Sequence, residues 1–247
     1  MSQFALSSVP VRFRPVMEAV AEAVFTIFDE QIEAFYTVGS APRGDFIDGS
    51  SDIDFRCILS EDASDDQVEL WIAQKKLLAS KFDYDVELML LPKARLDNLG
   101  VLQFVIVRDG VLIFGRPYQP TMMFPPRGFK LAQFLSQNMP RQLAEASAAI
   151  DSPDINPGDY ARISRWIAKV GIRLGANLAI AKGEAFRASI HEQTDFAIHK
   201  VPALAEPIRA LFEIYLHPSD TKAQLSAAVA DVAKVVAEAK SSHVLED

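Results

Sequence analysis

The sequence predicts an α+β module over residues 1–120 followed by an all-helical module over residues 121–247. In the first part, short runs of β-branched and aromatic residues alternate with segments of helical periodicity. In the second part, helical periodicity continues almost throughout. A cluster of prolines separates the two parts and is typical of a linker: Pro117, Pro120, Pro125 and Pro126.

Strands are expected in the first part where Val, Ile, Phe and Tyr gather in short runs. The first run ends at a glycine, the second alternates apolar and polar residues, and the third is stopped by Pro92. A fourth, shorter run follows. These runs lie at residues 35–39, 52–60, 83–92 and 110–115.

Helices are expected where apolar residues recur every three to four positions. The first helix is expected over residues 14–35, with Pro15 in a position that suits a first turn. Another follows Ser64, whose spacing to Gln67 is that of a capping box, and runs to about residue 82. Further helices are expected at 93–106, at 159–182, where a glycine follows, and at 221–240.

Composition and charge limit the class of protein. Hydrophobic residues make up 49% and charged residues 23%, as in soluble globular proteins, and the uncharged stretch 98–107 is far too short to cross a bilayer. With Cys57 as the sole cysteine and no secretory signal pattern, the cytoplasm is the expected compartment. Residues 1–120 carry 19 acids and 11 bases, so nucleic acid is not an expected partner.

Paired acids in the second predicted strand indicate a metal site. Asp52 and Asp54 are two residues apart, so both side chains leave the same face of a strand. Two carboxylates this close repel each other, and a cation between them relieves the repulsion. Oxygen ligands of this kind suit Mg²⁺, which also takes phosphate oxygens.

A third acid is expected from the next strand, where Asp85 and Glu87 share one face. If the two strands pair, these acids can meet the first two. Glu87 lies between Val86 and Leu88 in the more strand-like part and is preferred, with Asp85 as the alternative.

A phosphate-binding turn is predicted directly after the first strand. Gly39 lets backbone N–H groups approach a phosphate closely, and Ser40 adds a hydroxyl donor. Because the paired acids follow soon after, the turn and the acids together predict one site for phosphates and metal.

This combination resembles the polymerase-beta-like nucleotidyltransferase superfamily. The resemblance is carried by Val38-Gly39-Ser40, eleven intervening residues, and Asp52-Ile53-Asp54-Phe55. The stretches VELML (86–90) and RDGVLIFG (108–115) are similar to those of small-molecule, aminoglycoside-type nucleotidyltransferases. The resemblance implies a catalytic domain at 1–120, with a small mixed sheet and flanking helices, and a helical substrate-binding domain at 121–247.

For such a family, the implied reaction moves a nucleoside monophosphate, expected to be AMP, from an NTP to a hydroxyl group of a small molecule such as an aminoglycoside. Pyrophosphate is released. Asp52, Asp54 and Glu87 would be catalytic and would hold two Mg²⁺ ions, with Asp85 as the alternative metal ligand to Glu87. Gly39 and Ser40 would hold the β- and γ-phosphates of the donor, expected to be ATP.

One further expectation from the resemblance concerns the second module. Lys169, which shares a helical face with Arg162, Arg165 and Arg173, would contact the triphosphate. The alternative for these basic residues is a solvated face with salt bridges to helix neighbours. Two other hypotheses on function stay open: transfer of AMP to a protein, and an antitoxin-like partner protein that binds a nucleotide with little turnover.

Overall fold

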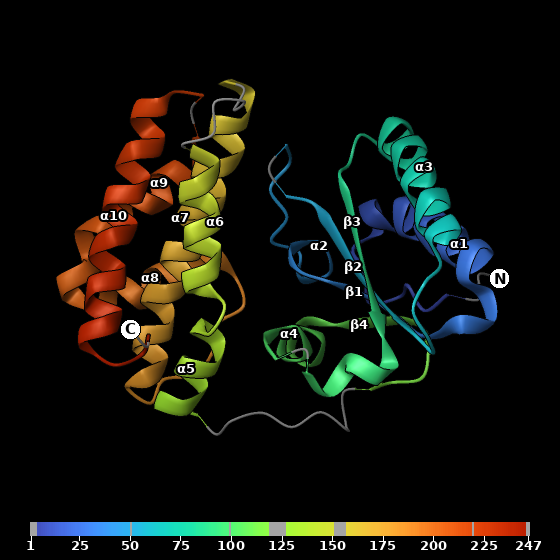
Figure 1. Ribbon diagram of the computed structural model, residues 1–247, viewed down its shortest axis with the longest axis horizontal. Coiled ribbons are helices and arrows are strands. Elements are labelled where there is room, and N and C mark those ends of the chain that lie inside the picture. Colours follow the sequence, from blue (N-terminus) through green and yellow to red (C-terminus); the bar gives the residue numbers. More distant parts are fainter. Residues whose placement is uncertain are drawn as a thin grey trace. The chain divides into compact units, whose positions relative to one another are not determined.

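A computed structural model describes residues 4–49, 51–98, 100–118, 127–150, 157–218 and 220–245. The chain divides into two compact units, unit 1 (Met1–Met123) and unit 2 (Phe124–Asp247). Unit 1 contains the sheet, and unit 2 is helical in its described residues (Figure 1). The predicted fold class is therefore confirmed. The predicted boundary after residue 120 falls outside the described residues.

Unit 1 is built on a mixed four-stranded sheet with the order β3-β2-β1-β4. β1 (Ile32–Val38) is antiparallel to both of its neighbours, β2 (Ile53–Leu59) and β4 (Val111–Gly115). β3 (Val86–Pro92) is parallel to β2. The four predicted strands are present, but β1 starts at Ile32 rather than at residue 35, because the first helix ends at Phe28, where Asp29 has a positive φ. β3 starts at Val86 rather than at residue 83, because Asp83 has a left-handed conformation at the end of the preceding helix.

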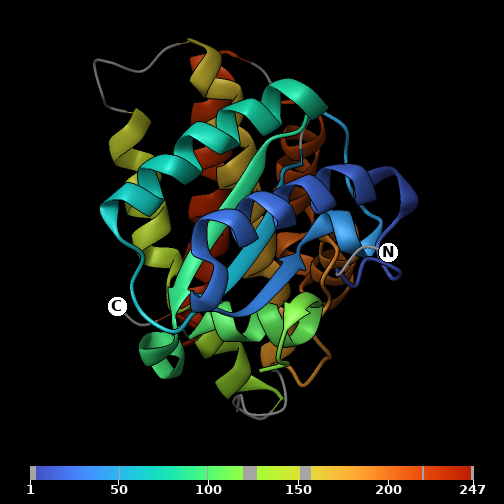
Figure 2. The same ribbon diagram turned by 90° about the vertical axis from the view of Figure 1, so that its right-hand side faces the viewer.

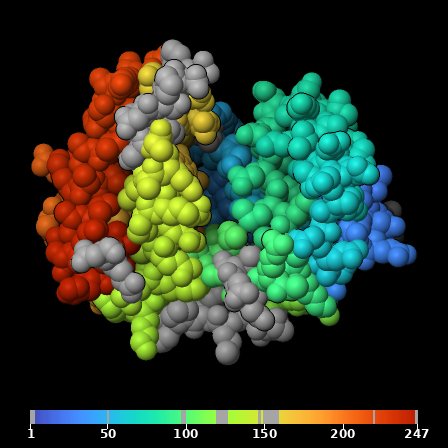
Figure 3. All heavy atoms as spheres, in the orientation of Figure 1, coloured from blue at the N-terminus to red at the C-terminus, as the bar shows by residue number. Residues whose placement is uncertain are grey.

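Helices α1 (Arg14–Phe28) and α3 (Asp65–Phe82) cover one face of the sheet (Figure 2). α3 begins at the predicted capping box: the Gln67 N–H donates to Ser64 Oγ, and the Ser64 N–H donates to Gln67 Oε1. Its outer side forms part of the surface of unit 1 (Figure 3), where Leu70 and Leu77 are exposed.

The other face of the sheet packs against α4 (Val101–Asp109), in a core that includes Tyr36 and Ile58. The single helix predicted at 93–106 is divided into a 3₁₀ helix, η3 (Lys93–Asn98), and α4, with Gly100 at φ +53° between them. Short helical turns complete unit 1: η1 (Val11–Phe13), η2 (Asp29–Gln31) and α2 (Ser40–Arg43).

Alternation along β2 separates its core residues from its polar ones. Ile53, Phe55 and Cys57 belong to the core beneath α1 and α3. Asp54 and Arg56, between them in the sequence, therefore lie on the opposite face of the strand. One face of β2 therefore carries polar side chains, and its other face packs into the core.

Unit 2 is organised around the long helix α7 (Pro157–Ala181), which packs against α5, α8, α9 and α10. Gly171 and Gly175 allow side chains of neighbouring helices to approach α7 closely. A Cβ at Gly171 would lie 2.7 Å from side-chain atoms of both Leu211 and Val232. The other helices are α5 (Phe129–Ser136), α6 (Met139–Ile150), α8 (Ile190–Lys200), η5 (Pro202–Leu204), α9 (Ala205–Leu216) and α10 (Lys222–Ser241).

The helices predicted at 159–182 and 221–240 correspond to α7 and α10, and Gly183, at φ +96°, follows α7. Among the residues that the structure describes, no helix is both long and apolar enough to cross a membrane.

Candidate active site

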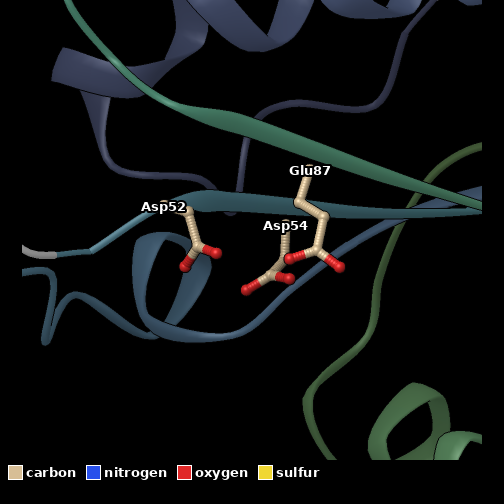
Figure 4. A group of neighbouring side chains, drawn as sticks. All are labelled: Asp52, Asp54 and Glu87. Carbon is tan, nitrogen blue, oxygen red and sulfur yellow. The ribbon is translucent and has the colours of Figure 1, made fainter. Parts of the chain in front are cut away.

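The parallel pairing of β2 with β3 brings three of the predicted acids together. The strand register places Asp54 beside Glu87. Asp52 lies two residues before Asp54, and its carboxylate points to the same side of the sheet (Figure 4). One carboxylate oxygen from each of Asp52, Asp54 and Glu87 lies within 4.8 Å of the others. We call these three residues the acidic triad.

The acidic triad is accessible to a hydrated ion from solution. Asp52 and Asp54 are half-buried, and Glu87 is exposed. Three carboxylates that converge in this way offer hard oxygen ligands, and their partial exposure leaves room for the waters that Mg²⁺ retains. The donor set therefore fits a divalent cation.

Asp85, the alternative third acid, does not belong to the triad. It precedes β3, its side chain is 73% exposed, and it forms an ion pair with Lys75 at 3.5 Å. Its carbonyl oxygen accepts a hydrogen bond from the Ile53 N–H at 2.9 Å, so its main chain continues the strand pairing. Of the two alternatives, the structure places Glu87 with the aspartates.

Gly39 makes room for the Asp54 carboxylate. Its backbone, at φ +83° and ψ −154°, is in a conformation that is open mainly to glycine. A Cβ at this position would lie 2.8 Å from Asp54 Oδ2, which is closer than atoms normally approach. The glycine of the predicted phosphate-binding turn is thus in direct contact with the triad.

The turn after Gly39 is held by local contacts. Ser40 is the first residue of α2 and its carbonyl oxygen accepts hydrogen bonds from the N–H groups of Gly44 and Asp45 at 3.0 and 3.2 Å. Arg43 pairs with Asp109 at the end of α4, at 2.7 Å, and with Asp45 at 3.3 Å. These ion pairs fix α2 next to the triad.

Arg56 is a site residue that the sequence reasoning missed. It is buried, at 8% exposure, and its Nη2 donates to Asp54 Oδ1 at 3.3 Å. Its Nη1 donates to the Phe55 carbonyl at 2.8 Å, and its Nε has no hydrogen-bond partner among the described residues. The available signal was a basic residue two positions after Asp54, since that spacing puts both on one face of a strand.

The basic residues of α7 lie in unit 2. Arg162 pairs with Asp159 at 3.2 Å, and Arg165 Nε donates to the Tyr215 carbonyl at 3.1 Å. Lys169 is half-buried. Its predicted contact with a nucleotide stays a prediction.

Comparison with known proteins supports the fold. No protein-family model matches the chain, and no curated protein matches it. A spectinomycin adenyltransferase from Enterococcus faecialis, solved with ATP and spectinomycin, has a similar structure, with a TM-score of 0.58 and 12% identity. The likeness covers 89% of this chain and 98% of that chain.

A toxin–antitoxin structure with AMP-PNP aligns at 19% identity over 54% of this chain and 94% of that chain, but its TM-score of 0.32 is too low to carry an argument. The likeness to the adenyltransferase extends over most of the chain. The chain therefore has the fold of that nucleotidyltransferase, and this is the fold that the resemblance in the sequence implied.

Proposed function

We propose that the protein is a metal-dependent nucleotidyltransferase that moves AMP from ATP to a hydroxyl group of a small molecule. The acceptor oxygen forms a bond to the α-phosphorus, the bond to the bridging oxygen breaks, and pyrophosphate leaves. The observation that carries the proposal is the acidic triad next to Gly39 and Ser40, in a chain with the nucleotidyltransferase fold.

Asp52, Asp54 and Glu87 are the residues that would hold Mg²⁺, and we expect two ions. Bound Mg²⁺ would offset negative charge on the triphosphate and favour loss of the proton from the acceptor hydroxyl. Glu87, as the most exposed member of the triad, is suited to accept that proton. Gly39 keeps the space beside Asp54 open, and the Ser40 hydroxyl would donate to a phosphate oxygen.

A small cationic acceptor suits the charge of the first part of the chain. Residues 1–120 have a formal net charge of −8, from 19 acids and 11 bases, and this charge attracts cations to the surface of unit 1. The solved adenyltransferase of similar fold was determined with spectinomycin, which supports a small hydroxylated acceptor. An aminoglycoside is the acceptor class that we propose.

The test is pyrophosphate release by the full-length protein, with ATP, MgCl₂ and a panel of aminoglycosides and related hydroxylated compounds. Asp52→Asn and Glu87→Gln should each lower the rate by at least about a hundredfold, because each removes a charge that positions the ions. Asp85→Asn is the matched control, since it removes an acid of the same strand region outside the triad. Its rate should stay close to that of the wild type.

Equal losses in the control and in the triad variants would contradict the proposal. Transfer of AMP to a protein but to no small molecule would support the alternative acceptor class. Binding of ATP without turnover across the panel would support the antitoxin-like hypothesis. Lys169→Ala should raise the KM for ATP, and an unchanged KM would contradict the predicted contact of Lys169 with the triphosphate.

A further inference from the structure

We propose that Arg56 is a built-in counter-charge of the acidic triad. It weakens the binding of a bare divalent cation to the free protein and so favours uptake of the ion together with the nucleotide. This inference deepens the proposed function and rests on the triad as a cation site.

The Arg56 guanidinium is fixed in place. One nitrogen donates to Asp54 Oδ1 at 3.3 Å and another to the Phe55 carbonyl at 2.8 Å. The residue is 8% exposed, so the side chain has little freedom to turn toward solvent. Because a buried cation without a partner is costly, the guanidinium stays paired with Asp54.

The charge of the site is only partly balanced. The triad has three carboxylates, and neither Asp52 nor Glu87 forms an ion pair with a residue that the structure describes. Arg56 therefore offsets one of three negative charges. This offset lowers the repulsion among the three carboxylates.

The two carboxylate oxygens of Asp54 have different neighbours. Oδ1 accepts a hydrogen bond from Arg56, whereas Oδ2 lies next to Gly39. An ion bound to either oxygen at the usual distance of about 2.1 Å lies close to a fixed positive charge. A unit positive charge about 5 Å from a divalent ion lowers the affinity of the site for that ion about tenfold, even at the dielectric constant of bulk water.

A nucleotide changes this balance. The complex of a divalent ion with a nucleoside triphosphate keeps a net negative charge, so Arg56 does not repel it. The same guanidinium that disfavours the bare ion is therefore compatible with the loaded nucleotide. The readout that isolates Arg56 is the affinity of the free protein for the ion alone.

The experiment is a titration of the full-length protein with Mn²⁺ alone, with free Mn²⁺ followed by electron paramagnetic resonance. Arg56→Met should bind Mn²⁺ about tenfold more tightly than the wild type. Arg56→Lys, which keeps the charge, should bind like the wild type. Arg56→Gln is a second neutral variant, which retains a hydrogen-bond donor for Asp54. It replaces Arg56→Met in the titration if the Met variant does not fold.

Arg95→Met is the matched control for net charge. Arg95 is exposed and pairs with Asp62. It lies after the last residue of β3, whereas Glu87 of the triad lies near the start of that strand. This variant should leave the Mn²⁺ affinity unchanged. Tighter binding in Arg95→Met equal to that in the Arg56 variants would overturn the inference, because net charge alone would then explain the effect.

Unchanged or weaker binding in both neutral Arg56 variants would also overturn it, since Arg56 would then only support the fold. If no variant and no wild-type protein binds Mn²⁺, the triad is not a cation site, and the proposed function fails with the inference. If the neutral variants bind more tightly but the wild type transfers no AMP, the inference stands and the proposed function fails.

Discussion

The contact between Gly39 and Asp54 gives the sharpest test of the site, through Gly39→Ala. The new Cβ would lie 2.8 Å from Asp54 Oδ2, and alanine would have to adopt φ +83° and ψ −154°. The carboxylate cannot simply turn away, because its other oxygen accepts a hydrogen bond from Arg56. The substitution should therefore displace Asp54 as well as strain the backbone.

Two magnitudes follow. A non-glycine residue in this sparsely populated conformation costs about 1–3 kcal/mol in the free energy of unfolding. A carboxylate that moves by up to about 1 Å in a catalytic site lowers the rate by about a hundredfold. We expect both losses in Gly39→Ala, together with weaker Mn²⁺ binding.

Urea unfolding measures the loss of stability, pyrophosphate release measures the loss of rate, and the Mn²⁺ titration measures the weaker binding of the ion. Gly44→Ala is the matched control: Gly44 also has a positive φ, +85°, but a Cβ there would meet no heavy atom within 4 Å. It should lose about 1–2 kcal/mol of stability and keep its Mn²⁺ affinity. If Gly39→Ala binds Mn²⁺ as the wild type does, or if both variants lose affinity equally, the reasoning about this contact is refuted.

Three other predictions concern the remainder of the molecule. Gly171→Ala should destabilise the protein by about 1–3 kcal/mol in urea unfolding, because its Cβ would overlap side chains of α9 and α10; an unchanged midpoint would contradict the close packing. The hydrogen bond from Lys93 lowers the pKa of Glu33, so Glu33 stabilises the fold above pH 4.5 and this contribution fades as the pH falls through the lowered pKa. The difference in Tm between the wild type and Glu33→Gln should shrink below pH 4.5, and a difference that is constant with pH would argue against the pairing. Burial raises the pKa of the Cys57 thiol, so a disulfide reagent should label it only after unfolding; fast labelling of the native protein would show that it is accessible.

Local patterns predicted those parts of the fold and site that depend on neighbours in the sequence. The spacing from Ser64 to Gln67 indicated the capping box, and the two-residue spacing of Asp52 and Asp54 indicated a shared face. The second module was expected to be helical, but the bounds of α5, α6, α8 and α9 were not assigned. Those bounds depend on packing within unit 2 rather than on strong local signals.

The features that the sequence could not decide depend on strand register and on contacts between strands. The choice between Asp85 and Glu87 rests on where β3 begins, which a left-handed residue at the end of α3 determines. The ion pair between Arg56 and Asp54 could have been proposed from spacing, but the burial of Arg56 depends on the tertiary structure and not on the local sequence. The contact of Gly39 with Asp54 requires the pairing of β1 with β2.

The connection between β2 and β3 has a consequence for folding. Two parallel strands cannot be joined by a tight turn, and here the chain between them includes α3. Glu87 therefore reaches the two aspartates only after this crossover has closed, so the unfolded chain has no equivalent chelating group. A divalent ion that binds the triad therefore binds only the folded state. Above the dissociation constant, each tenfold increase in the ion concentration should add about 1.4 kcal/mol to the free energy of unfolding.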